Sequence, residues 1–265
     1  TQCNQAGDCN EIFSYPMFRA LERVQASFTG IAAHRLFGAN LAFKGQTESG
    51  EGVLVSGSYF PVLGINPALG RLLGPDDDKT VGGHYVTVLS HEYWRRRFNE
   101  DPNVLNDSII INGHAFTVVG VAPAGFNGTT LGPRPQVFVP ITMRALMQPG
   151  PFGNAFENRR SYWIYLFARL KPGVSIDQAR VALNRPFRAI LKDVEAPLQK
   201  GMSDQTMQRF LAKEVTLEPG PRGQSDLHRE AQAPLLILLA VTGTVLLIAC
   251  ANIANLLLAR GAGRA

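Results

Sequence analysis

Reactive and metal-binding side chains are scarce in this chain of 265 residues. It has three cysteines and five histidines, and the histidines lie far apart in the sequence. The phosphate loop GxxxxGK[ST], the dinucleotide fingerprint GxGxxG and the nucleophile elbow GxSxG are all missing. We therefore expect no nucleotide, cofactor or metal site and no catalytic residue, and we do not expect this chain to be an enzyme.

Concentrated charge is also missing, because the formal net charge is only +5 and the basic residues are scattered. The exceptions are residues 95–97 and 159–160, which are all arginine, and no basic stripe indicates a nucleic-acid partner. We expect residues 95–97 to be the solvated end of a short helix. The acidic run 76–78 lacks the alternating ligands, central Gly and distal Glu of a calcium loop. We expect it to be a solvated loop or the start of a helix.

The three cysteines fall in two different environments. Cys250 lies within an apolar run and is expected to behave as a small hydrophobic residue. Cys3 and Cys9 lie close together in the polar stretch TQCNQAGDCN. In an oxidising compartment a disulfide would close this small loop, and two free thiols on a terminal segment fit the sequence equally well.

The longest uncharged apolar run covers residues 233–259. As a helix it would reach roughly 40 Å, which exceeds the ~30 Å hydrocarbon thickness of a bilayer. We predict a transmembrane helix, and a buried core helix is the alternative. Asp226 and Glu230 precede the run, whereas Arg260 and Arg264 follow it. This asymmetry predicts that residues 1–230 lie outside the cytoplasm.

Two amides interrupt the apolar run near its end. Asn252 and Asn255 share one helix face, and Ala251, Asn255 and Ala259 form a line of small residues at four-residue spacing. Buried amides in lipid need partners, so we expect a packing seam against another membrane helix or a second subunit. The alternative is that the amides reach the cytoplasmic interface.

Helix starts can be read from three serines in the first 230 residues. Ser14, Ser90 and Ser175 each precede an amphipathic segment and are expected to cap a helix. The third helix should run over residues 176–191, with Pro186 kinking or dividing it.

Extended segments alternate with these helices. Asn112-Gly113 joins two apolar segments, 107–111 and 114–121, and this dipeptide is the strongest short hairpin signal. Residues 29–43 are expected to form a strand and a turn, and a short helix, capped by Ser58, is expected over 58–63. Further strands are expected at 53–55, 85–89, 136–141, 162–170 and 214–218. This alternation favours an α+β or mixed α/β fold.

Several strings resemble a known family when taken in order. VSGSYFPVLGINPALGRLLGPDDD and VTVLSHEYWRRRFNEDPNVLNDSIIINGHAFTVVGVAPAGFNG resemble the periplasmic core domain of MacB-type ABC permeases. LLIACANIANLLLARGAGR resembles the first helix of the FtsX-like membrane domain that follows it. The acidobacterial duplicated orphan permeases are the most similar variant, and the resemblance covers roughly residues 12–264.

The resemblance implies a domain organisation. Residues 1–11 remain unassigned, 12–230 would be an extracytoplasmic core domain of two mixed α/β subdomains, and 231–265 a transmembrane helix that begins the FtsX-like domain. The apolar run would be the second membrane helix of a longer polypeptide. Since the chain starts without Met and stops five residues beyond Arg260, we expect it to be a piece of such a polypeptide.

The resemblance also implies a function and a location. Such permeases lie in the bacterial plasma (inner) membrane and transmit conformational change across it for export or envelope processes. The expected partners are the lipid bilayer, the other helices of the permease, a second permease subunit and a separate cytoplasmic ATPase. The alternatives are a membrane-anchored sensor or ligand-binding module and a membrane-tethered hydrolase.

Overall fold

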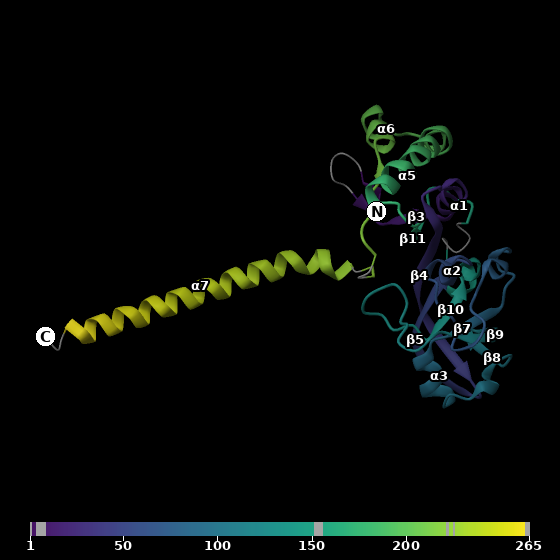
Figure 1. Ribbon diagram of the computed structural model, residues 1–265, viewed down its shortest axis with the longest axis horizontal. Coiled ribbons are helices and arrows are strands. Elements are labelled where there is room, and N and C mark those ends of the chain that lie inside the picture. Colours follow the sequence, from purple (N-terminus) through teal and green to yellow (C-terminus); the bar gives the residue numbers. More distant parts are fainter. Residues whose placement is uncertain (1, 4–8, 151–155, 221–222, 225, 263–265) are drawn as a thin grey trace. The chain divides into compact units, whose positions relative to one another are not determined.

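The computed structural model describes residues 2–3, 9–150, 156–220, 223–224 and 226–262, with only the backbone described at 3, 9–10, 226–233, 252 and 255–262 (Figure 1). These residues form two compact units. The first unit comprises Thr1–Gly128 and Pro133–Pro221, and the second comprises Thr129–Gly132 and Arg222–Ala265. The predicted boundaries after residues 11 and 230 remain predictions.

A mixed sheet of nine strands forms the centre of the first unit. Its order is β3-β11-β4-β5-β10-β7-β9-β6, and β8 pairs with both β4 and β9. Strand β10 runs parallel to β5, and β7 runs parallel to β9, whereas the other pairs are antiparallel. The strands are β3 (Ile12–Ser14), β4 (Phe28–Phe43), β5 (Gln46–Val55), β6 (Leu69–Gly70), β7 (Val86–Leu89), β8 (Ser108–Ile111), β9 (His114–Val121), β10 (Val137–Pro140) and β11 (Tyr162–Leu170).

Helices cover this sheet, and a small second sheet has the order β12-β1-β2. Figure 1 shows α5 and α6 near β3 and β11, at the opposite end of the first unit from α3. The helices are α1 (Tyr15–Val24), α2 (Tyr59–Leu63), α3 (His91–Phe98), α4 (Arg144–Met147), α5 (Ile176–Ile190) and α6 (Asp204–Leu211). Short helical turns are η1 (Pro75–Asp78), η2 (Pro102–Val104), η3 (Ile141–Met143), η4 (Leu191–Glu195) and η5 (Ala196–Leu198). The small sheet consists of β1 (Gln2–Cys3), β2 (Cys9–Asn10) and β12 (Glu214–Val215).

The core lies on both faces of the main sheet. Successive side chains of a strand point to opposite faces. Accordingly, Val137 and Val139 belong to one buried cluster and Phe138, between them, to the other. Strand β10 is therefore apolar at every position, as expected for a strand covered on both sides.

Three of the four predicted serine caps form, whereas Ser58 precedes α2 without a side-chain cap hydrogen bond. The Oγ atoms of Ser14, Ser90 and Ser175 accept hydrogen bonds from backbone N–H groups three residues later, at 3.3, 3.3 and 3.2 Å. Each bond satisfies a backbone donor that the first helical turn leaves without a partner. The predicted helices α1, α3 and α5 are thus confirmed.

The predicted hairpin is also confirmed. Asn112 and Gly113 join β8 to β9 with φ values of 47° and 85°, the left-handed conformations that a tight hairpin turn requires. The Asn112 side chain adds long-range bonds, because its Oδ1 accepts from Asn40 N at 2.7 Å and its Nδ2 donates to Met147 O at 2.9 Å. The turn is therefore tied to β4 and to the end of α4.

One local expectation is wrong, and one of the two outcomes expected at Pro186 does not occur. No turn falls within 29–43, since β4 is one strand that pairs along its length with β5, and the chain turns at Lys44 and Gly45. Pro186 does not divide its helix, since α5 continues to Ile190. Burial of Phe187 directly after the proline stabilises the helix against the loss of one backbone hydrogen bond, which costs about 3 kcal/mol.

The second unit is dominated by α7 (Asp226–Ala262), a helix of 37 residues. Its stretch Pro234–Ala251 has a mean hydropathy of 2.5, and no residue of this stretch is buried. The hydroxyl groups of Thr242 and Thr244 donate to helix carbonyls at 2.8 to 3.0 Å. By length and composition this helix can cross a membrane, and its polar side chains within that stretch are satisfied internally.

Candidate functional site

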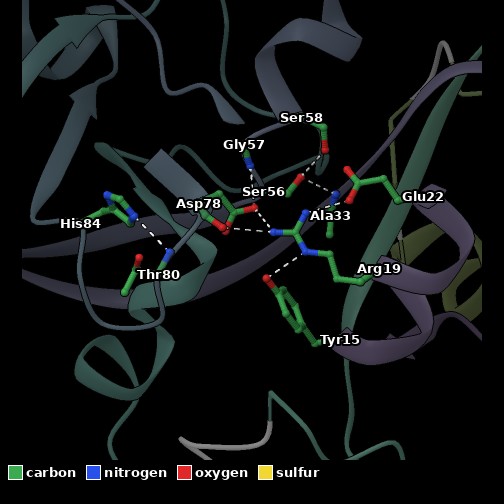
Figure 2. A network of polar contacts seen from close by, with 10 residues as sticks. All are labelled: Tyr15, Arg19, Glu22, Ala33, Ser56, Gly57, Ser58, Asp78, Thr80 and His84. Atoms are coloured by element: carbon green, nitrogen blue, oxygen red, sulfur yellow. Dashed lines mark hydrogen bonds and ion pairs between the residues drawn. The ribbon is translucent and has the colours of Figure 1, made fainter. Parts of the chain in front are cut away.

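A cleft of about 590 Å³ opens on the first unit. Four segments form it: α1, the turn before α2, the η1 turn with the residues after it, and the segment before β11. Its wall carries a network of polar contacts, which Figure 2 shows. The lining residues are Tyr15, Arg19, Glu22, Arg23, Gly57, Ser58, Pro75, Asp78, Lys79, Val81, Phe156 and Glu157.

Arg19 is the central donor of this network. Because α1 places residues three and four apart on one face, its guanidinium reaches both Glu22 and Tyr15. Arg19 Nη1 donates to Glu22 Oε2 at 2.7 Å, and Nε donates to Tyr15 Oη at 2.9 Å. Nη2 forms an ion pair with Asp78, which lies 59 residues further along the chain (Figure 2).

Asp78 joins three segments of the chain. Its carboxylate accepts from Arg19 of α1 and, at 3.0 Å, from the backbone N–H of Gly57 before α2. Asp78 itself ends the η1 turn, which packs closely on Gly57. A Cβ atom at Gly57 would lie 2.6 Å from Pro75 Cα and 2.7 Å from Gly74 O, so only glycine allows this approach.

The expectation that the run 76–78 is solvated is only partly right. Asp76 is exposed, but Asp77 and Asp78 are each 6% exposed. Asp77 accepts two hydrogen bonds from Arg71, at 2.6 and 2.9 Å, and one from Gly74 N at 2.9 Å. The η1 turn points two of the three carboxylates inward, where arginines from other segments neutralise them.

The two buried carboxyls differ in their proton affinity. Burial raises the pKa of Asp78, and the Arg19 guanidinium offsets this only in part. Burial also favours the neutral form of Asp77, but the bonds from Arg71 and Gly74 outweigh it and lower the pKa of Asp77. Burial, with the nearby charge of Asp78, raises the pKa of Tyr15 to about 12. Tyr15 is thus a neutral acceptor for Arg19.

Serine and histidine side chains near the cleft accept hydrogen bonds from backbone N–H groups. Ser56 Oγ accepts from Ala33 N at 2.9 Å and lies 2.9 Å from Ser58 Oγ, while His84 Nε2 accepts from Thr80 N at 3.1 Å (Figure 2). Within the described parts of the chain, no serine hydroxyl hydrogen-bonds to a histidine, and no three His, Cys, Asp or Glu side chains are grouped to hold a metal ion. The contacts described at the cleft are ion pairs and hydrogen bonds to the backbone.

The residues that the sequence singled out lie elsewhere. The backbones of Cys3 and Cys9 are paired directly across β1 and β2, but their side chains lie outside the described residues. Ala251 is exposed on α7, and the side chains of Asn252, Asn255 and Ala259 lie outside the described residues. The disulfide and the packing seam remain predictions.

The cleft residues were not predicted from the sequence. Gly57 lies where a strand gives way to a helix, which hints at a close approach but names no partner. The capping serine before α1 and the aspartate run 76–78 can both be recognised in the sequence. Nothing local connects Arg19 to a carboxylate 59 positions away, so only the tertiary fold reveals the ion pair.

Two solved structures are similar in fold. The periplasmic region of MacB from Actinobacillus actinomycetemcomitans is 16% identical, with a TM-score of 0.54 over 71% of this chain and 82% of the other. The extracellular domain of the noncanonic ABC-type transporter YknZ from Gram-positive bacteria is 14% identical, with a TM-score of 0.54 over 82% and 98%. The comparison with curated protein sequences gives no match.

Sequence comparison identifies the family. The sequence model described as the MacB-like periplasmic core domain matches residues 4–185, more than half of the chain. The mixed α/β fold of the first unit agrees with this match, and so does its likeness to periplasmic and extracellular domains of ABC-type transporters. The predicted fold class is thus confirmed, and the chain belongs to the family of MacB-like periplasmic core domains.

Proposed function

We propose that this chain is the extracytoplasmic portion of an ABC-type permease, together with one of its membrane helices. The domain would transmit conformational change across the membrane for export or envelope processes. Family membership is the observation that carries the proposal, because MacB-like periplasmic core domains belong to transport rather than to catalysis.

The helix α7 supports attachment to a membrane. Its apolar stretch of 18 residues corresponds to about 27 Å at 1.5 Å per residue, close to the thickness of the hydrocarbon core. We place residues 1–230 on the periplasmic or extracellular side of the bacterial inner membrane. The acidic residues before the stretch and the arginines after it favour this orientation.

The polar network supports a domain that moves as one body. Arg19, Asp78 and Gly57 link α1, the η1 turn and the turn before α2 across long sequence separations. Such buried, charge-assisted contacts resist shear between the segments that they join. A displacement delivered by the membrane helices would then move the first unit as one body relative to α7. The force would come from a separate cytoplasmic ATPase, and a second permease subunit would complete the transporter.

Pulsed spin-label distance measurements on the complete permease with its ATPase would test the transmission. One label replaces Val181 on α5 and the other replaces Leu246 on α7, both exposed side chains. We expect the distance distribution to change when ATP is added. A control pair at Val181 and Ile110, both within the first unit, should not change. Identical distributions for the first pair with and without ATP would refute the proposal.

Cysteine labelling in spheroplasts would test the orientation. In a background with Cys3→Ser, Cys9→Ser and Cys250→Ser, a membrane-impermeant maleimide should label Gly220→Cys in intact spheroplasts and Ala262→Cys only after lysis. The opposite pattern would place residues 1–230 in the cytoplasm.

A ligand-binding module is the second candidate, favoured by the cleft itself. The cleft presents aromatic surface from Tyr15 and Phe156 beside charged groups of both signs. Aromatic and polar groups that converge in a concave site are typical of small-molecule sites. If the cleft binds a ligand that the transporter senses, occupancy should alter the ATP-dependent distances described above. A ligand response without any ATP response would favour this second candidate.

A further inference from the structure

Arg144 is a buried cation without a carboxylate partner among the described residues. It begins α4, is only 8% exposed, and its Nε and Nη1 atoms are sealed from solvent with no hydrogen-bond acceptor. Its guanidinium carbon lies 3.9 Å from the centre of the Trp163 ring on β11. In the described part of the chain, no carboxylate forms an ion pair with Arg144. A stacked ring faces the cation but accepts none of its N–H groups in plane.

Arg35 adds a second unpaired cation to the same place. Its guanidinium carbon lies 5.7 Å from the centre of the Tyr165 ring, two residues after Trp163 on β11. The two positive charges influence each other, because burial and the charge of Arg35 lower the pKa of Arg144 to about 10. Within the described residues, Arg35 has no ion pair either.

Neighbouring groups add further polar atoms. Thr142 Oγ1 and Trp163 Nε1 are buried and lack a hydrogen-bond partner. His34 precedes Arg35, and burial together with the charge of Arg35 lowers the pKa of His34 to about 4, so this ring is neutral. Buried charges in proteins are ordinarily paired, because an uncompensated charge away from water is strongly destabilising.

We propose that Arg144 and Arg35, each stacked on an aromatic ring of β11, form a binding site for a small oxyanion group such as a phosphate or a carboxylate. The group would pair with the positive charges of both guanidiniums, whose planar forks suit the oxygens of such anions. The Trp163 ring stacks on Tyr15, so this site adjoins the Arg19–Asp78 network, but it uses different arginines, because Arg19 already has its carboxylates.

Tryptophan fluorescence can report on this site directly. The chain contains two tryptophans, so Trp94→Phe leaves Trp163 as the only emitter. The full chain in neutral detergent is titrated with sodium phosphate, and separately with sodium acetate, replacing chloride at constant ionic strength. We expect a saturable change in Trp163 emission with at least one of the two anions. The anion that acts distinguishes a phosphate group from a carboxylate group.

Arginine variants decide whether the response belongs to this site. Arg144→Met and Arg35→Met should each weaken the apparent affinity by on the order of tenfold or more, since a charge-assisted hydrogen bond is lost. Arg185→Met removes an exposed charge on α5 and should leave the affinity unchanged. If Arg144→Met does not fold, Arg144→Lys takes its place as the variant. The rise in the melting temperature of the parent chain with added anion is then measured as a second sign of binding. Absence of a saturable response in the parent chain, or a response equal in all arginine variants, would overturn the proposal.

Discussion

Single residues at the cleft carry charges whose partners come from distant segments. Arg19 is three-quarters buried and has two acidic partners, whereas the Asp78 side chain is only 3% exposed and depends on Arg19 and on one backbone N–H group. This asymmetry sets the consequence of each substitution. Substitution of Arg19 leaves the buried Asp78 carboxylate without its cation. Substitution of Asp78 leaves Arg19 still paired with Glu22.

Arg19→Met should destabilise the domain by about 3 kcal/mol or more, because Asp78 would be buried without its cation. Adding Asp78→Asn should recover part of that loss, so the double variant should be more stable than Arg19→Met alone. Urea unfolding of the four proteins in a double-mutant cycle measures both effects. Arg23→Met on the same helix is the control and should change stability by no more than about 0.5 kcal/mol. Additive effects would contradict the described ion pair.

Gly57→Ala should cost about 1–3 kcal/mol, because the new methyl group meets the backbone of Pro75 and Gly74 rather than a flexible side chain. Gly74→Ala is the matched control, since a Cβ atom there has no neighbour within 4 Å and φ is −131°. Thermal unfolding of the two variants compares them directly. A smaller loss for Gly57→Ala than for Gly74→Ala would contradict the close approach of η1.

Helices and strands are held in place by two kinds of contact: contacts between residues close in the sequence, and contacts between residues far apart in it. The NG turn and the serine caps of α1, α3 and α5 are local and form as predicted. By contrast, the side-chain amide of Asn184 on α5 pairs with the backbone of Val215 as a neighbouring strand would. Its Oδ1 accepts from Val215 N at 2.7 Å, and its Nδ2 donates to Val215 O at 2.9 Å. That contact secures β12, the strand on which the terminal sheet is built.

The terminal sheet makes the cysteine prediction testable. Because Cys3 and Cys9 are paired in register on adjacent antiparallel strands, we expect a disulfide in the protein isolated from its oxidising compartment. Alkylation without reductant followed by mass spectrometry should modify Cys250 alone. Cys3→Ser should expose Cys9 to alkylation and cost about 2 kcal/mol, the loop entropy of seven residues. Alkylation of all three cysteines in the native chain would contradict the bridge.

The amides of α7 give a second prediction for an element. Replacing Asn252 and Asn255 together by Leu should leave membrane insertion intact but weaken helix packing by about 1–3 kcal/mol, since interhelical amide bonds would be lost. Cross-linking yield to neighbouring helices of the complete permease is the measurement. Thr244→Val is the control, because that hydroxyl already bonds to Ala240 O within its own helix. An unchanged yield in the double variant would mean that the amides face the interface.

The whole molecule divides between a domain with its own core and an apolar helix. Both buried clusters consist of residues of the first unit alone. None of the side chains in the apolar stretch of α7 is buried. The driving force for folding the domain therefore lies outside the helix.

Residues 12–221 should fold without α7 as a soluble monomer with one cooperative unfolding transition, because their core is complete. Size-exclusion chromatography and calorimetry test this expectation. Titration with ATP should release no binding heat, since no phosphate loop is present. Aggregation of this fragment, or tight binding of ATP, would show that the domain depends on partners that its core does not suggest.

Features that depend on neighbouring residues could be predicted from the sequence: the capped helices, the NG hairpin, the long apolar helix and, through ordered motifs, the family. At Pro186 the helix is not divided, and Phe187 is buried beside the proline. Only the folded structure shows that two aspartates of a polar run turn inward, that Arg19 pairs with one of them, and that Arg144 has no ion pair among the described residues. Such pairings join positions dozens of residues apart, and their energies depend on burial and distance, which composition and periodicity do not encode.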